Sequence, residues 1–232
     1  MLFAGHVSLA ILINHVLASF GRQKLVFAHA SLICVIIAAV IPDLDFLFYD
    51  FIGHHTITHS VTFWAIVYAP LFMFWRLKTL PYFIATLSHL LGDFIIGNPP
   101  LLYGISDMRF GLVFDYATAN LANDQFMLVR SFVDLPVVIG LLIARRTVFS
   151  VHHLFSSEKE VAIALPILVV LVATIFVTSQ LHDKVFFGRN HDWPVFIAAY
   201  SILAVSHALV LLVVLLEARR YMRKSAEPLK SR

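Results

Sequence analysis

Charged residues and cysteine are scarce in this chain. Only 13% of the 232 residues are charged, whereas about 25% is usual for a soluble globular domain. The single cysteine, Cys34, excludes a disulfide framework within the chain. With 60% hydrophobic residues and a mean hydropathy of +0.86, the composition excludes an ordinary soluble domain and indicates a polytopic membrane protein.

The positive charge does not indicate a nucleic-acid partner, although the formal net charge is +3. Lysine and arginine occur in short clusters at the ends of apolar segments, which is how membrane topology signals are distributed. The N-terminal residues lack a basic region ahead of their apolar stretch. We therefore expect a retained membrane helix there rather than a cleaved signal peptide.

Apolar segments recur along the chain at lengths near the ~20 residues that a bilayer-spanning helix needs. The candidates are residues 3–20, 25–41, 61–77, 80–97, 126–144, 161–179 and 195–217. We therefore expect an all-α transmembrane bundle of about seven helices over residues 1–218, with the site motifs in residues 1–146, and a polar cytoplasmic tail at 219–232. Pro42 is expected to end or kink the second helix.

Every second connection between these segments is basic. The basic residues are Arg22 and Lys24, Arg76 and Lys78, Arg145, Arg146 and Lys159, and Arg219, Arg220, Arg223 and Lys224. The positive-inside rule places these connections in the cytoplasm. We expect an integral plasma (inner) membrane protein with its N-terminus outside and its C-terminus in the cytoplasm.

Histidines and aspartates gather at the opposite, outer face. They occur in "PDLDF" (Asp43 and Asp45), "GHHTITHS" (His54, His55 and His59) and "SHLLGDF" (His89 and Asp93), with His6 at the outer start of the first helix. The i, i+4 spacing of His89 and Asp93 puts both side chains on one helix face, as two ligands of one metal ion require. The alternative for this pair is a structural hydrogen bond between helices. Arg130 and Asp134, also four residues apart, are expected to form a local ion pair.

These motifs, in the order "GHVSLAIL", "IPDLDF", "HHTITHS", "SHLLGDF" and "GISDMRFGL", resemble the YdjM-like family over about residues 1–146. That family is described as LexA-binding, inner-membrane-associated, metal-dependent hydrolases. The order of histidines and aspartates is more faintly similar to zinc-dependent phospholipase C. The family has an arginine where this chain has His55, so His55 would contact an anionic substrate only when protonated, or would be a ligand instead.

Residue chemistry and resemblance together indicate a site for a divalent metal ion. We expect the metal ligands to be His6, Asp43, His59, His89 and Asp93, for one ion or for two ions sharing an aspartate. Zinc is the first expectation and manganese the second. Asp45 or His54 would act as general base or orient a ligand.

The predicted function is hydrolysis of a membrane lipid or lipid-linked phosphoester at the outer membrane–water boundary. Arg109 would pair with its phosphate, and His55 would be the other substrate-binding residue. Two alternatives stay open: a non-catalytic protein that binds or transports a metal ion or proton, and a protein whose site is structural and that binds a protein partner.

Overall fold

The structure, a computed structural model, describes residues 3–20, 24–48, 56–106, 108–112, 123–151 and 193–226, with isolated positions between 163 and 170. Across these residues the chain forms helices and no strand, which confirms the all-α class. The main helices are α1 (Phe3–Phe20), α3 (Leu32–Val40), α5 (Val61–Trp75), α6 (Leu80–Ile96), α7 (Asn123–Val151) and α9 (Trp193–Ala226). The short elements are α2 (Lys24–Ala28) and the 3-10 helices η1 (Ile41–Phe48), η2 (Ile57–His59) and η3 (Arg76–Thr79).

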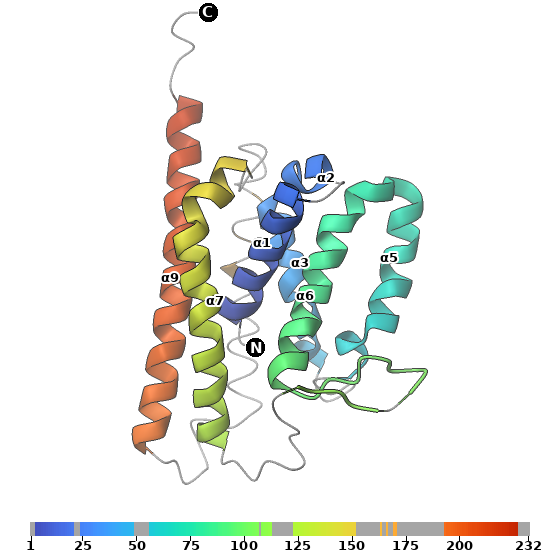
Figure 1. Ribbon diagram of the computed structural model, residues 1–232, viewed down its shortest axis with the longest axis vertical. Coiled ribbons are helices and arrows are strands. Elements are labelled where there is room, and N and C mark those ends of the chain that lie inside the picture. Colours follow the sequence, from blue (N-terminus) through green and yellow to red (C-terminus); the bar gives the residue numbers. More distant parts are fainter. Residues whose placement is uncertain are drawn as a thin grey trace, which may run out of the picture.

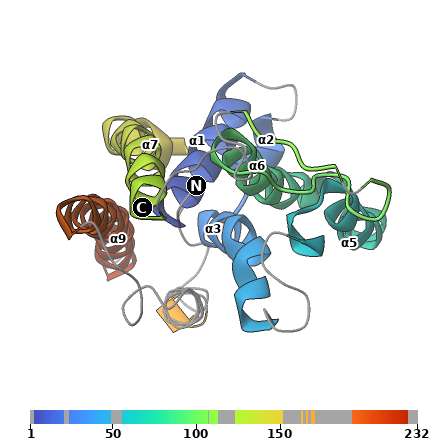
Figure 2. The same cartoon turned by 90° about the horizontal axis from the view of Figure 1, so that it is seen from below.

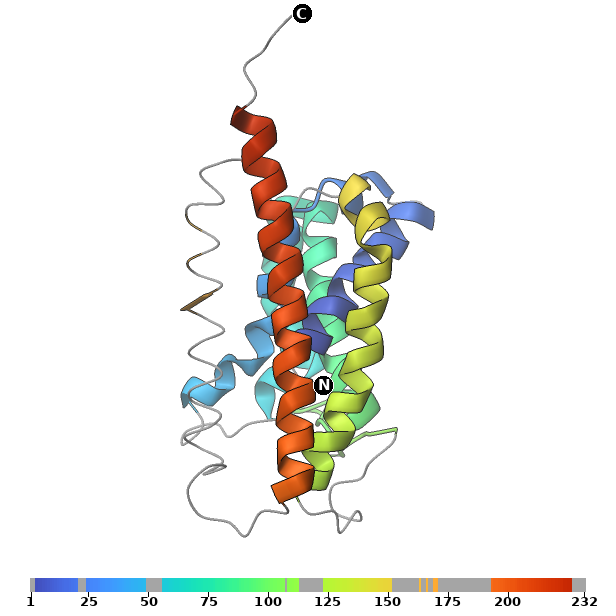
Figure 3. The same ribbon diagram turned by 90° about the vertical axis from the view of Figure 1, so that its left-hand side faces the viewer.

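The helices pack side by side, with α5 and α9 at opposite edges of the bundle (Figure 1). Seen from below, α3 lies near the centre, and α1 and α6 lie beside it (Figure 2). The buried side chains of α3, including Leu32, Ile33 and Ile36, belong to one hydrophobic cluster with residues of α1 and α7 such as Ile11 and Leu141. Helices α7 and α9 run in the same direction and form a pair along one side (Figure 3).

Three segments of the described chain are long and apolar enough to cross a membrane. They are Val61–Ile96, Met127–Ser150 and Trp193–Arg220. The first contains both α5 and α6, which are joined through η3 and lie side by side (Figure 1). Arg76, with φ of 51° in the left-handed region, makes the reversal between them. Membrane-spanning character is thus supported, but the expected count of seven spans is not confirmed.

The expected second span, residues 25–41, differs most from the structure. The chain instead forms the five-residue α2, an extended backbone at Ser31 and the nine-residue α3. At 1.5 Å per residue α3 is only about 14 Å long, roughly half of a bilayer core. Seven of its nine residues are buried, so its apolar sequence reflects a central core position. As expected, α3 ends just before Pro42, and the two aspartates follow in η1.

Two other expectations lie partly or wholly outside the described residues. Segment 161–179 is described only at isolated positions. The expected tail begins as a continuation of α9, which remains helical to Ala226.

The two ends of the bundle differ in chemistry. One end holds the α5–α6 reversal, with Arg76 and Lys78 (Figure 1). The carboxyl ends of α7 and α9, which carry the other described arginine pairs, lie at the same end. The start of α1, the elements η1 and η2, the end of α6 and the start of α7 lie toward the other end. The predicted metal ligands and Asp45 belong to that second group of segments.

Candidate metal centre

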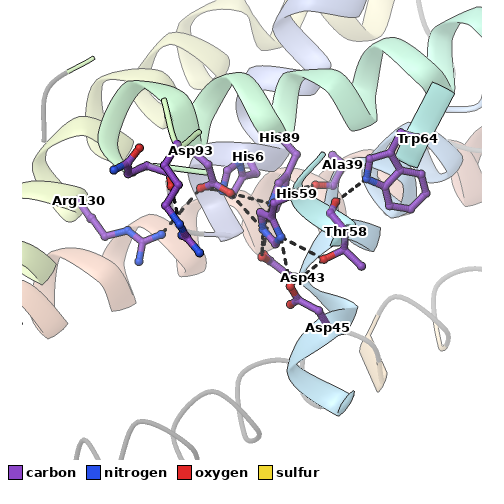
Figure 4. Close-up of polar contacts among 12 residues, drawn as sticks. His6, Ala39, Asp43, Asp45, Thr58, His59, Trp64, His89, Asp93 and Arg130 are labelled. Atoms are coloured by element: carbon purple, nitrogen blue, oxygen red, sulfur yellow. Dashed lines mark hydrogen bonds and ion pairs between the residues drawn. The ribbon is translucent and has the colours of Figure 1, made fainter. Parts of the chain in front are cut away.

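His59, at the end of η2, lies between two aspartates of η1 (Figure 4). Its Nε2 is 3.5 Å from Asp43 Oδ1, and its Nδ1 is 3.2 Å from Asp45 Oδ2. Thr58 Oγ1 donates a hydrogen bond of 2.8 Å to the same Asp45 oxygen. Trp64 Nε1 in turn donates to the Thr58 carbonyl at 2.6 Å. The ring of His59 is therefore held by Nδ1, and Nε2 faces the interior of the cluster.

His89 presents its Nε2 to the same point from α6. Its Nδ1 lies 2.7 Å from the backbone carbonyl oxygen of Ala39, near the end of α3. A carbonyl oxygen can only accept a hydrogen bond, so Nδ1 carries the hydrogen. In the neutral ring Nε2 then carries a lone pair. That Nε2 lies 3.3 Å from Nε2 of His59 and 3.4 Å from Asp43 Oδ1.

Asp93, one helical turn after His89, uses its two oxygens on two sides. Oδ2 lies 3.2 Å from His89 Nε2 and 3.3 Å from His59 Nε2. Oδ1 lies 3.3 Å from Nε2 of His6, on the first turns of α1. The ring of His6 stacks on that of His89 with centroids 3.7 Å apart. The structure thus brings together all five residues expected to bind metal.

The donor set fits a divalent ion. Two groups have ligand atoms close enough to share one ion: Asp43 with His59 and His89, and His6 with His89 and Asp93. In a tetrahedral zinc site, bonds of about 2.0–2.1 Å place neighbouring ligand atoms about 3.3–3.4 Å apart. The separations among Asp43, His59 and His89 are 3.3, 3.4 and 3.5 Å. Those atoms therefore have the spacing of one face of such a tetrahedron.

The net charge of the cluster also favours a divalent cation. Asp45 and Asp93 are almost fully buried, and Asp43 is 15% exposed. With neutral imidazoles, the three carboxylates and the guanidinium of Arg130, 3.9 Å from Asp93 Oδ1, leave two negative charges. Buried charges are costly unless they are paired or bind a metal. A divalent cation would neutralise the cluster.

The pKa values of Asp43 and His59, which lie outside the membrane-spanning segments, reflect the unbalanced charge of the cluster. Burial by itself would raise the pKa of Asp43, but the neighbouring imidazoles of His89 and His59, when protonated, bring it well below its usual value. Burial by itself would lower the pKa of His59, but hydrogen bonds to the three aspartates raise it well above its usual value. In the ion-free protein a proton on His59 partly neutralises the carboxylates, at the place where a cation would do so.

The remaining predicted site residues are not brought into this cluster by the described contacts. His54 and His55 lie outside the described residues. Arg109 is exposed, and its Nη1 donates to the carbonyl oxygen of Asn98 at 3.4 Å. Arg130 on α7, for which a local ion pair with Asp134 was expected, also lies 3.9 Å from Asp93 on α6 (Figure 4). Helical spacing within α7 alone gave no signal for that contact.

Comparison with protein-family models, curated proteins and solved structures finds no match for this chain. The resemblance to the YdjM-like family accordingly rests on the sequence motifs alone.

Proposed function

We propose that the protein is a membrane-embedded, metal-dependent hydrolase that binds zinc and acts on a lipid or lipid-linked phosphoester. The observation that carries the metal is the pair of Nε2 atoms of His59 and His89, 3.3 Å apart, with each Nδ1 facing a protein oxygen. Metal-binding histidines commonly have the second nitrogen held in this way by a carboxylate or carbonyl.

A purely structural hydrogen bond explains this pair poorly. If each Nδ1 carries the hydrogen, the two facing Nε2 atoms both present lone pairs and neither can donate. A cation between them, or a proton on one ring, is needed to make the contact favourable. Since the neighbouring groups are the aspartates Asp43 and Asp93, a divalent cation satisfies all four side chains at once.

The burial of Asp45 favours one of its two predicted roles. Its oxygen contacts Nδ1 of His59 and the hydroxyl of Thr58, so we assign it to orienting His59. His54 then remains the proposed general base. When bound, a divalent ion polarises a phosphoryl oxygen and lowers the pKa of water toward neutrality. The protein's own part is to hold the ligands, keep the cluster dry and position the substrate.

A lipid substrate is supported by the segment that follows α6. Its large apolar side chains Ile105, Met108 and Leu112 are 64–74% exposed. The segment is tied to the site at both ends, because the Leu101 carbonyl accepts hydrogen bonds from Ser60 and Val61, and Leu112 N–H donates to the Phe94 carbonyl. An exposed apolar segment beside the cluster suits contact with lipid. We further propose that this end of the bundle faces the exterior of the inner membrane, since the described basic clusters lie at the other end.

Elemental analysis of the full-length protein in detergent tests the proposal. Wild type should contain about one zinc per chain, and His59→Ala and His89→Ala should lose both zinc and hydrolysis of phospholipid in vesicles. His207→Ala is the matched control, because this histidine lies on α9 and its Nδ1 bonds its own helix at Leu203. Wild-type zinc content and activity in both cluster variants would refute the proposal.

A second candidate is a metal-binding protein without catalysis. It is favoured by the burial of the three histidines, each at most 1% exposed, because structural metal sites are closed whereas catalytic sites keep an open position. Zinc that is lost in both cluster variants, together with no hydrolysis by zinc-loaded wild type, would select this candidate.

A further inference from the structure

Arg130 contacts the metal-binding cluster through Asp93, and its position is unusual. It lies in the second turn of α7, inside the membrane-spanning candidate Met127–Ser150. Its side chain is only 18% exposed. An arginine within a spanning segment is costly and marks a functional site more often than a passive one.

Asp93 links this arginine to the imidazole pair. Its Oδ2 faces His59 and His89, and its Oδ1 faces His6 and Arg130. The guanidinium is therefore separated from the facing imidazoles by the width of the Asp93 carboxylate (Figure 4). Nη2 of Arg130 lies 3.9 Å from Oδ1 of Asp93, so the two side chains attract each other by charge.

We infer that Arg130 forms an anion subsite next to the metal centre and binds the phosphoryl group of the substrate. This inference rests on the proposed function and names the substrate's recognition element. A guanidinium presents five N–H donors in a planar fork that matches phosphate oxygens. A phosphoryl group at this position contacts the guanidinium through one oxygen and faces the metal ligands with another. Arg130 thereby takes the role that sequence reasoning gave to Arg109.

Binding of orthophosphate to full-length protein in detergent, followed by calorimetry with and without added zinc, tests this subsite. Arg130→Gln should weaken phosphate binding by about 10- to 100-fold, the usual loss for a hydrogen bond to a charged group, with zinc content unchanged. Arg130→Lys should lose less, since it keeps the charge but not the fork. Arg146→Gln is the matched control, an exposed arginine near the far end of the same helix, and should bind phosphate as wild type does. Arg109→Gln is measured beside it.

The outcomes separate this inference from the proposed function. Zinc binding with phosphate affinity unchanged in Arg130→Gln overturns the subsite and leaves the metal centre standing. Loss of zinc in both Arg130 variants also overturns it, because the residue would then be structural. A phosphate loss in Arg109→Gln in place of Arg130→Gln, or no phosphate binding by wild type in either state, overturns it as well. Phosphate binding that depends on Arg130 in a protein that takes up no zinc would preserve the subsite and refute the metal-dependent function.

Discussion

Replacing Asp45 by Asn should weaken zinc binding without abolishing it. The change keeps the size of the side chain and leaves an oxygen to accept from Thr58, but it removes the negative charge 3.2 Å from Nδ1 of His59. Asp45 faces the side of the ring away from Nε2, so no proposed metal ligand is lost. The substitution therefore isolates the effect of orienting and polarising one ligand.

The expected loss of zinc affinity follows from the position of Asp45 beside His59 and from the charge that Asp45 carries. Removing a group that holds a metal-ligating histidine typically costs 10- to 100-fold in metal affinity, or about 1.4–2.8 kcal/mol. Both side chains are fully buried, so solvent does not replace the lost contact, and the upper part of this range is expected. The cluster's formal charge also changes from two negative charges to one, so a divalent ion would no longer be balanced.

The assay is competition for zinc against a chelator of known affinity, with kcat for vesicle phospholipid measured at saturating zinc. Asp134→Asn is the matched control, because Asp134 is equally buried but packs beside Gly5 on α1, and its zinc Kd should stay near the wild-type value. An Asp45→Asn variant with wild-type zinc affinity and wild-type kcat would refute the orienting role. Unchanged zinc affinity with collapsed kcat would make Asp45 the general base instead.

Three further predictions test the packing, the lipid contact and the protonation of the site. Gly5→Ala should lower the free energy of unfolding in detergent by about 1–3 kcal/mol, because the new Cβ would clash with the buried carboxylate of Asp134. Gly140→Ala is the control, since its Cβ meets only an ordinary contact, and it should raise that free energy by up to about 1 kcal/mol. Equal shifts of the melting temperature in the two variants would contradict the packing. Ile105→Ser with Met108→Ser should slow hydrolysis of vesicle lipid but spare a soluble short-chain phosphoester, and equal losses on both substrates would count against lipid contact. Zinc should bind more tightly at pH 8 than at pH 6. The aspartates raise the pKa of His59, and its proton must leave before the metal binds. A zinc affinity that does not depend on pH would show that His59 is not a ligand.

The residues that the structure gathers were predictable where a local rule applied. The i, i+4 spacing put His89 and Asp93 on one face of α6, and Pro42 marked the end of α3. The separation of basic clusters from the site residues followed from lysine and arginine alone. These signals are carried by short stretches of sequence and do not need the packing of other helices.

Contacts between distant segments could not be predicted in this way. Spacing within α7 predicts only the contact of Arg130 with Asp134, whereas the structure also places Arg130 3.9 Å from Asp93 on α6. The position of His207 gave no signal for its contacts either: its Nδ1 bonds its own helix at Leu203, and its ring stacks on Phe3 of α1. The apolar run at 25–41 has the composition of a span, and only its burial in the bundle distinguishes a short core helix from a crossing one.

The short central helix also explains the depth of the site. A full span at 25–41 would carry Asp43 to the surface of the membrane, but α3 ends after nine residues, and Asp43 and Asp45 remain largely buried. His89 lies seven residues before the end of α6, which is about 10 Å inside that end of the helix. Between the ~30 Å hydrocarbon core and the ~40–45 Å total thickness of a bilayer, each headgroup layer occupies only about 5–8 Å. If α6 ends near the membrane surface, the cluster lies at the boundary between headgroups and acyl chains, where a phospholipid carries its phosphoester. A lipid would reach Arg130 and the imidazole pair by moving within its own layer, whereas a soluble phosphoester would have to leave water first.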